Sequence, residues 1–120
     1  MEKQYRVKKS KDIELIIKNK KFASCPYFTI YIKKQDETNH FRYAMSVGKK
    51  IGNAVVRNRL KRQIRAIIRN VNIIDGFDIF IIVRNKILDV DYETMSNQMV
   101  QLLKKLKLIK KGENDGSIFK

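Results

Sequence analysis

Residues 43–69 read YAMSVGKKIGNAVVRNRLKRQIRAIIR, and this stretch decides the fold that we expect. It holds most of a strand over 41–47, a glycine-containing loop over 49–53, and the strongest helix of the chain, from Ala54 to about Asn70. The spacing of a buried helical stripe is met by Val56, Leu60, Ile64, Ile67 and Val71. One side of this helix is therefore expected to pack on a core.

Positive charge is concentrated in the same stretch. The chain has 27 Lys and Arg against 12 Asp and Glu, which gives a formal net charge of +15. The net charge of a small soluble domain usually has a magnitude of about 2–8. No acid occurs from Thr38 to Ile74, a segment that holds nine of the cations. At about 100° per residue, one arc of the helix carries Arg57, Lys61, Arg62, Arg65 and Arg69, with Asn58 among them.

We call these five cations the cationic ridge. Its members repel one another at i,i+4 spacing, and no acid lies nearby to offset the repulsion. A solvated helix face is the alternative interpretation, but such faces usually intersperse the two signs of charge. The ridge therefore favours a polyanionic partner.

The rest of the chain supplies the elements around this helix. A first helix is predicted from Ser10 to about Lys20, with apolar positions at Ile13, Ile16 and Ile17. A strand follows Pro26, and a polar, hairpin-like connection over 34–39 joins it to the strand over 41–47.

Two further elements follow the basic helix. The apolar run Ile79–Val83 suits a central strand covered on both faces. A last helix is expected over about 91–109, with a core stripe of Tyr92, Met95, Met99, Leu102, Leu103 and Leu106. The order is αββαβα, with a possible short extra strand, which gives one sheet with helices packed on it.

Composition excludes several classes of protein. A chain of 120 residues with 43% apolar content predicts one domain over 1–120, with a mobile arm over about 1–9 and a frayed tail over about 112–120. No apolar stretch approaches the roughly 18 residues of a membrane span, and the N-terminus lacks an apolar secretory core. The single cysteine, Cys25, fits a reducing compartment, so a cytoplasmic location is expected.

A strand face with two aromatic rings lies near the helix in sequence. Tyr27, Thr29 and Tyr31 alternate with Phe28, Ile30 and Ile32 and therefore share one face. Their side chains either pack under a helix or stack on bases of single-stranded RNA. The neighbouring cationic ridge makes Tyr31 a candidate RNA contact.

Protein-based chemistry has few candidate residues. His40 is the only histidine, and Cys25 has no second ligand or base to complete a zinc site or a nucleophile pair. Asp75 and Asp78 bracket a turn and are expected to cap it. No phosphate-binding glycine loop is present. These absences argue against a self-sufficient enzyme.

The motif Arg57-Asn58-Arg59, followed by Leu60-Lys61-Arg62 and Arg65, resembles the signature of the bacterial ribonuclease P protein family. The preceding residues 46–55 match as well, and the similarity covers nearly the whole chain. The resemblance implies an α+β, single-domain α/β sandwich of order αβββαβα with a left-handed βαβ crossover, of the ribosomal-protein-S5-domain-2 type.

The resemblance also implies a function. The holoenzyme removes the 5′ leader of precursor tRNA, and its catalytic component is RNA with bound Mg²⁺. The protein would be an auxiliary subunit without a catalytic residue or a cofactor of its own. Its partners would be the catalytic RNA and precursor tRNA, with no membrane and no DNA.

Site residues follow from the matching positions. The RNA-binding residues implied are Lys49 and Lys50 in the loop, and Arg57, Asn58, Arg59, Lys61, Arg62, Arg65 and Arg69 on the helix. The implied leader cleft contains Ile13, Ile17, Thr29, Tyr31, Lys61 and Arg65. Relatives commonly have phenylalanine at the positions of Ile13 and Ile17, so this chain keeps an apolar wall there but lacks the rings. Asn58 either orients a hydrated ion or hydrogen-bonds a phosphate or the core edge.

Three other functions are weighed against this one. Another small RNA-binding protein, such as a ribosomal protein, would share the basic helix but not the Arg57-Asn58-Arg59 context. A helix-turn-helix DNA binder needs a helix directly before the recognition helix, and strands flank this one. An autonomous nuclease should show clustered carboxylates or a histidine–nucleophile pair.

Overall fold

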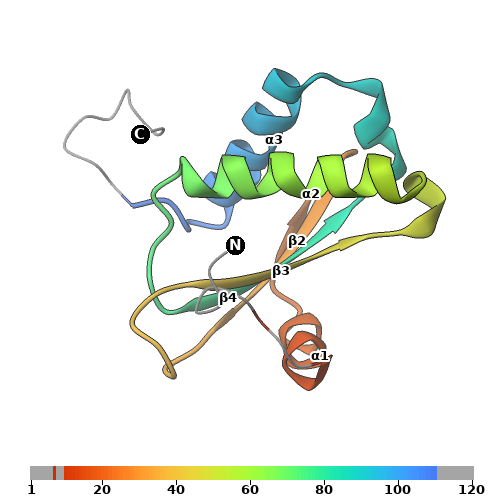
Figure 1. Ribbon diagram of the computed structural model, residues 1–120. Helices are drawn as coiled ribbons and strands as arrows, with labels where there is room; N and C mark the ends of the chain where they lie inside the picture. Colours follow the sequence, from red (N-terminus) through yellow and green to blue (C-terminus); the bar gives the residue numbers. More distant parts are fainter. Residues whose placement is uncertain (1–6, 8–9, 111–120) are drawn as a thin grey trace.

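The computed structural model describes Val7 and residues 10–110, and its helices and strands follow the order αβββαβα (Figure 1). The short extra strand is present as β1. The elements are α1 (Ser10–Lys18), β1 (Phe22–Ser24), β2 (Phe28–Lys34), β3 (Arg42–Val47), the 3₁₀ turn η2 (Lys49–Ile51), α2 (Ala54–Arg69), β4 (Phe77–Val83), the 3₁₀ turn η3 (Asn85–Asp89) and α3 (Tyr92–Lys105).

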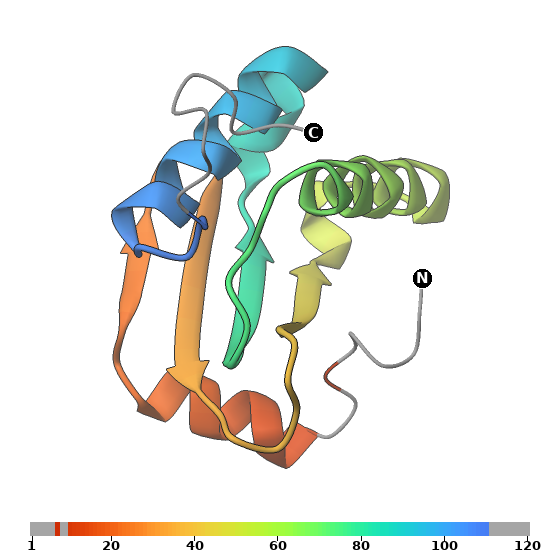
Figure 2. The same cartoon turned by 90° about the vertical axis from the view of Figure 1, so that its left-hand side faces the viewer.

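The four strands of the described chain form one mixed sheet in the order β1-β2-β4-β3. β2 pairs antiparallel with both β1 and β4, whereas β3 and β4 are parallel. The hairpin-like connection expected over 34–39 is therefore wrong, because β4 lies between β2 and β3 (Figure 2). A strand as apolar as β4 needs cover on both faces and neighbours on both edges, and the central position provides these.

The connection from β3 through α2 to β4 is a left-handed crossover between parallel neighbours (Figures 1 and 2). This is the hand that the family resemblance implies and the opposite of the usual one. It places α2 and α3 together on one face of the sheet and α1 alone on the other (Figure 1).

The main core lies between the sheet and the α2–α3 layer. It contains the predicted stripe of α2, with Leu60, Ile64 and Ile67 almost fully buried, and the inward residues of β2. A second, smaller cluster joins Ile16 of α1 to Phe80 on the opposite face of β4. Both faces of β4 are thus buried, as its sequence predicts.

Helix ends differ from the predicted ones where the backbone reverses. α1 ends at Lys18, since Lys20 has a φ of 59°. α3 ends at Lys105, since Lys107 has a φ of 62° and the Leu108 amide donates to the Leu103 carbonyl at 2.9 Å, the pattern of a Schellman cap. Tyr92 was expected in the core stripe of α3, but it is 41% exposed because it lies in the first, outward-facing turn.

Side chains cap the two long helices at their N-termini. The Asn53 side-chain Oδ1 accepts from the Val56 amide at 3.0 Å, and the Asp91 carboxylate accepts from the Thr94 amide at 2.9 Å. The bond from Thr94 lowers the pKa of Asp91 below its ordinary value. Both caps satisfy amides that an isolated helix leaves without a partner.

Val7 is the only described residue of the predicted N-terminal arm, and it is attached to the domain. Its amide donates to the Tyr43 carbonyl at 3.0 Å, and its side chain is buried in the cluster of Ile16 and Phe80. The rest of the predicted arm, and the tail over 112–120, lie outside the described residues. Val7 thus packs beside the β3 edge, and the mobility expected for the arm stays a prediction.

The close approach of Gly52 to α2 predicts a stability effect. A Cβ at position 52 would lie 2.9 Å from the Val56 Cβ, so Gly52→Ala should lower the free energy of unfolding by about 1–2 kcal/mol through overpacking. Gly48 has open space and an ordinary extended backbone, so Gly48→Ala should be neutral or raise stability by a few tenths of a kcal/mol. Urea unfolding of both variants checks this contrast, and equal effects would contradict it.

Candidate RNA-binding surface

The cationic ridge runs along the side of α2 that is not buried in the core. α2 contains six Lys or Arg and no acid. Arg57, Lys61 and Arg65 are half-buried, which restrains their aliphatic stems. The other polar members of the predicted set are exposed: Asn58, Arg59, Arg62 and Arg69.

The start of α2 adds further positive groups. Arg57 Nε donates to the Gly52 carbonyl at 3.2 Å, which fixes this guanidinium beside the loop. Lys49 and Lys50 lie exposed on η2, directly before that loop. The predicted loop cations therefore lie directly before the first cations of α2 in the chain, and both sets are at least partly exposed.

Arg65 is a ridge residue with a buried guanidinium nitrogen. Its Nε is buried and has no hydrogen-bond acceptor among the described residues. Burial raises the pKa of Tyr43, and the positive charges of Arg65 and Arg69 act in the opposite direction. The Arg65 guanidinium thus lies close enough to Tyr43 on β3 to act on its pKa, and its half-buried stem is restrained on the ridge.

The opposite face of the sheet presents aromatic and hydroxyl side chains in rows. Strand register aligns Phe22, Tyr31, Phe80 and Ala44 in one row. The same register aligns the next row, Ser24, Thr29, Ile82 and Ser46. α1 packs on the first row through Ile13 and Ile16.

We call the row that contains Ser24, Thr29 and Ser46 the hydroxyl row. It ends beside Arg84 and Lys86, in a region that we call the basic corner. Ser24 Oγ and Thr29 Oγ1 lie 3.0 Å apart, and Arg84 Nη1 donates to Ser24 Oγ at 3.3 Å. Arg84 follows β4 and is exposed, as is Lys86 on η3. A hollow of about 680 Å³ at this corner is lined by Ser24, Cys25, Pro26, Arg84, Asn85 and Lys86.

The six residues of the implied leader cleft divide into two groups in the structure. Ile13, Tyr31 and Thr29 share the α1 face of the sheet, and Ile17 is an exposed residue of α1. Lys61 and Arg65 belong to α2, which covers the other face (Figure 1). Strand β3 separates the two groups, with Tyr43 toward α2 and Ala44 toward α1.

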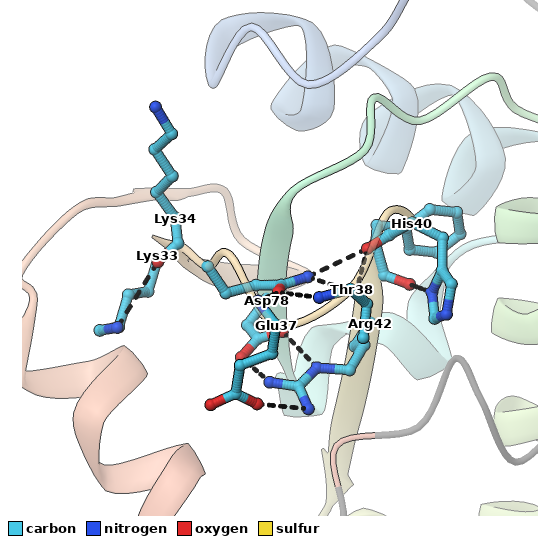
Figure 3. A network of polar contacts seen from close by, with 9 residues as sticks. Lys33, Lys34, Glu37, Thr38, His40, Arg42 and Asp78 are labelled. Carbon is cyan, nitrogen blue, oxygen red and sulfur yellow. Dashed lines mark hydrogen bonds and ion pairs between the residues drawn. The ribbon is translucent and has the colours of Figure 1, made fainter.

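Arg42 does not belong to the free positive surface, although it falls in the acid-free stretch of the sequence. Its Nε and Nη2 donate to the two carboxylate oxygens of Asp78 at 2.8 and 2.7 Å. Its Nη1 lies 3.3 Å from the exposed Glu37 carboxylate (Figure 3). The hydrogen bonds that Arg42 donates to Asp78 raise the Arg42 pKa above its ordinary value.

The same network corrects the prediction for Asp78 and shows how the loop before β3 is held. Asp78 was expected to cap a turn, but it lies inside β4 and is buried. The loop before β3 is held by the buried Gln35, whose Oε1 accepts from the Glu37 and Thr38 amides and whose Nε2 donates to the His40 carbonyl. His40 is part of this loop, and its Nδ1 lies 2.8 Å from the Phe41 carbonyl oxygen.

Sequence reasoning missed Phe22, Ser24 and Arg84 as residues of the α1 face. β1 is only three residues long, too short for an alternating pattern to show. Arg84 lies outside the acid-free stretch.

Other kinds of site find no support in the described part of the chain. Residue 7 and residues 10–110 hold no group of three or more His, Cys, Asp or Glu side chains arranged to bind a metal ion. No described helix is long and apolar enough to cross a membrane. Cys25 is a free thiol at the basic corner.

A mixed sheet with an acid-free cationic helix beside one face and an aromatic, hydroxyl-bearing opposite face is the arrangement of an RNA-binding α+β domain. The family model "Ribonuclease P" matches residues 1–107. The chain belongs to this family, and it is a protein component of the tRNA-processing endoribonuclease whose other component is the ribonuclease P RNA.

Relatives and solved structures agree with this assignment. The ribonuclease P protein component of Mycoplasma mycoides subsp. mycoides SC is 44% identical over 104 residues, which is 84% of this chain and 94% of the relative. That of Streptococcus mutans is 36% identical over 113 residues, or 93% and 94% of the two chains. The Staphylococcus aureus protein gives a TM-score of 0.80 at 33% identity, covering 88% of this chain and 98% of the other. The Thermotoga maritima protein gives 0.72 at 31%, covering 89% and 98%.

Proposed function

We propose that this ribonuclease P protein component binds the catalytic RNA through the cationic ridge and holds the single-stranded 5′ leader of precursor tRNA on the α1 face of the sheet. The observation that carries the proposal is the ridge itself: five cations along one side of α2, a helix that contains no acid. A phosphate backbone offsets the mutual repulsion of such a row and supplies acceptors to its donors.

The leader is assigned to the α1 face because that face suits an unpaired strand. Tyr31 offers a ring to a base, while Ser24, Thr29 and Ser46 offer hydroxyls to sugars or phosphates. Ile13 supplies an apolar wall on α1. Lys61 and Arg65 then contact phosphates on the other side of β3, where the leader joins the region that meets the catalytic RNA.

The protein's contribution to the reaction is electrostatic and positional. Catalytic RNA and precursor tRNA are both polyanions, and a cationic domain between them lowers the cost of their approach. The magnesium ions that the holoenzyme uses are assigned to the RNA, since phosphate oxygens are the hard ligands that Mg²⁺ prefers. Cleavage of the phosphodiester bond takes place on the RNA, and removal of the leader in the cytoplasm gives the mature 5′ end.

A reconstitution assay tests this function. The protein is added to a bacterial ribonuclease P RNA at a low Mg²⁺ concentration, and leader removal from precursor tRNA is followed over time. We expect cleavage to be slow with the RNA alone, fast with both components, and absent with the protein alone. Cleavage by protein pretreated with ribonuclease, or no stimulation of the RNA, would contradict the proposal.

The salt dependence of tRNA affinity is a second test of the same proposal. Each phosphate contact to single-stranded RNA should contribute about 0.7 to the slope of log affinity against log salt concentration. We expect precursor tRNA to show a steeper slope than mature tRNA with the same holoenzyme, because only the precursor has leader phosphates. Equal slopes would exclude leader phosphates from the protein's contacts.

A further inference from the structure

Phe22 is the most exposed aromatic side chain in the described part of the chain, at 53% exposure. It lies on β1, the edge strand, directly opposite Tyr31 in the sheet register. The two ring centroids are 5.1 Å apart and the ring planes are tilted by 35°. An apolar ring in this position is held by its neighbour but covered by nothing among the described residues.

The surroundings of Phe22 belong to the face assigned to the leader. One side of Tyr31 packs on the cluster of Ile16 and Phe80 beneath α1, which we call the α1 cluster. Ser24, two residues after Phe22, is the first residue of the hydroxyl row. The chain reaches Phe22 from α1 through a tight turn at Lys20, whose amide donates to the Ile17 carbonyl at 3.1 Å. This turn brings the edge strand directly after the exposed end of α1.

The other side chains of this face cannot provide the same surface. Ile13 and Ile17 are aliphatic, and Ile13 is partly buried against the α1 cluster. Phe80 is buried beneath α1. The rings open to solvent on this face are therefore those of Phe22 and, in part, Tyr31.

We propose that Phe22 is the base-stacking side chain of the leader site, and that the Phe22–Tyr31 pair replaces the aromatic surface that Ile13 and Ile17 do not supply. The ligand is an unpaired base of single-stranded RNA, and a purine is favoured over a pyrimidine because its larger ring system stacks over more area. This inference rests on the proposed binding of the leader to the α1 face.

A single-tryptophan variant reports base stacking directly. The chain contains no tryptophan, so Phe22→Trp introduces one fluorophore at the proposed site. In the reconstituted holoenzyme, we expect precursor tRNA to quench its fluorescence and mature tRNA, which has no leader, to leave it unchanged. Tyr92→Trp is the matched control, because Tyr92 is exposed at the start of α3 on the opposite face.

Affinity measurements separate Phe22 from the leader site as a whole. Phe22→Ala should weaken holoenzyme binding to precursor tRNA about five- to tenfold, the effect of one lost base stack, and leave binding to mature tRNA unchanged. Phe22→Tyr should retain wild-type affinity. Phe22→Tyr should unfold at the wild-type temperature, whereas Phe22→Ala loses the ring contact with Tyr31 and should unfold a few degrees lower, so affinity is measured well below both transitions.

Two negative results have different meanings. Wild-type affinity of Phe22→Ala, in an enzyme that still prefers precursor to mature tRNA, would overturn the role of Phe22 and leave the leader site standing. Equal binding of precursor and mature tRNA by the wild-type holoenzyme would overturn the leader site and this inference together. Quenching of Tyr92→Trp to the same extent as Phe22→Trp would also overturn the inference.

Discussion

Asp78→Ala should lower the free energy of unfolding by about 3 kcal/mol, the loss expected when one partner of a buried ion pair is removed. The variant leaves Arg42 without its two shortest hydrogen bonds, at 2.8 and 2.7 Å. The Arg42 side chain is largely buried, so water cannot fully replace the lost carboxylate. Glu37 remains near Arg42 and keeps the loss at the lower end of the range for buried pairs.

Glu37→Ala is the matched control for this prediction. The Glu37 side chain is 73% exposed and contacts the same guanidinium at 3.3 Å. Such exposed pairs contribute less than about 1 kcal/mol. Urea unfolding followed by circular dichroism should therefore separate the two variants clearly. If they lost the same stability, Asp78 would not be the residue that holds Arg42 in the fold.

The pH dependence of this ion pair also follows from its chemistry. The hydrogen bond from Arg42 to Asp78 raises the Arg42 pKa above its ordinary, already high value. A group whose pKa is raised by folding stabilises the fold fully at any pH below its unfolded-state pKa. That stabilisation is lost only as the pH rises through the folded-state pKa. The contribution of Arg42 to the free energy of unfolding is therefore constant across the neutral pH range. The stability lost in Asp78→Ala should accordingly not vary with pH in that range.

Arg65→Ala should weaken binding of precursor tRNA to the holoenzyme about tenfold or more, the effect of losing one charge-assisted hydrogen bond to a phosphate. Arg65 differs from the other ridge residues because its buried Nε has no acceptor among the described residues. Because its stem is restrained by this partial burial, the Arg65 guanidinium loses little conformational freedom when its remaining donors bind an RNA phosphate. The prediction is checked by measuring affinity for precursor tRNA with and without the leader.

Controls distinguish the Arg65 hydrogen bond from a general loss of charge. Lys104→Ala removes one positive charge from an exposed position on α3 and should leave affinity near the wild-type value. Arg65→Lys keeps the charge but not the planar donors, and should recover only part of the affinity. Unchanged binding of Arg65→Ala to both RNAs would remove Arg65 from the site.

Local pattern was sufficient for most of the secondary structure. The stripe of α2 is buried as its spacing predicts, and the apolar run of β4 occupies the centre of the sheet. Local pattern was insufficient where tertiary contacts override propensity. β4 separates β2 from β3, and Val7 docks at the β3 edge although its neighbours in sequence are polar.

The site could be predicted only in part, for the same reason. All the ridge residues lie on one helix, so helical spacing alone places them on one side of it, and in the structure they all belong to α2. Asp78 lies 36 residues from Arg42 in the chain, so no local pattern shows that Arg42 is neutralised. The implied leader cleft mixes residues that the sheet separates, with Arg65 beside Tyr43 and Tyr31 beneath α1.

The sequence by itself determined the family, the basic helix and the charge of the partner. Helical periodicity and an acid-free run are properties of neighbouring residues, and folding does not change them. Only the tertiary structure decided which of the positive charges are free and where an exposed ring meets Tyr31. Strand register brings Phe22 to Tyr31 and Asp78 to Arg42, and register depends on how distant segments pair rather than on either segment alone.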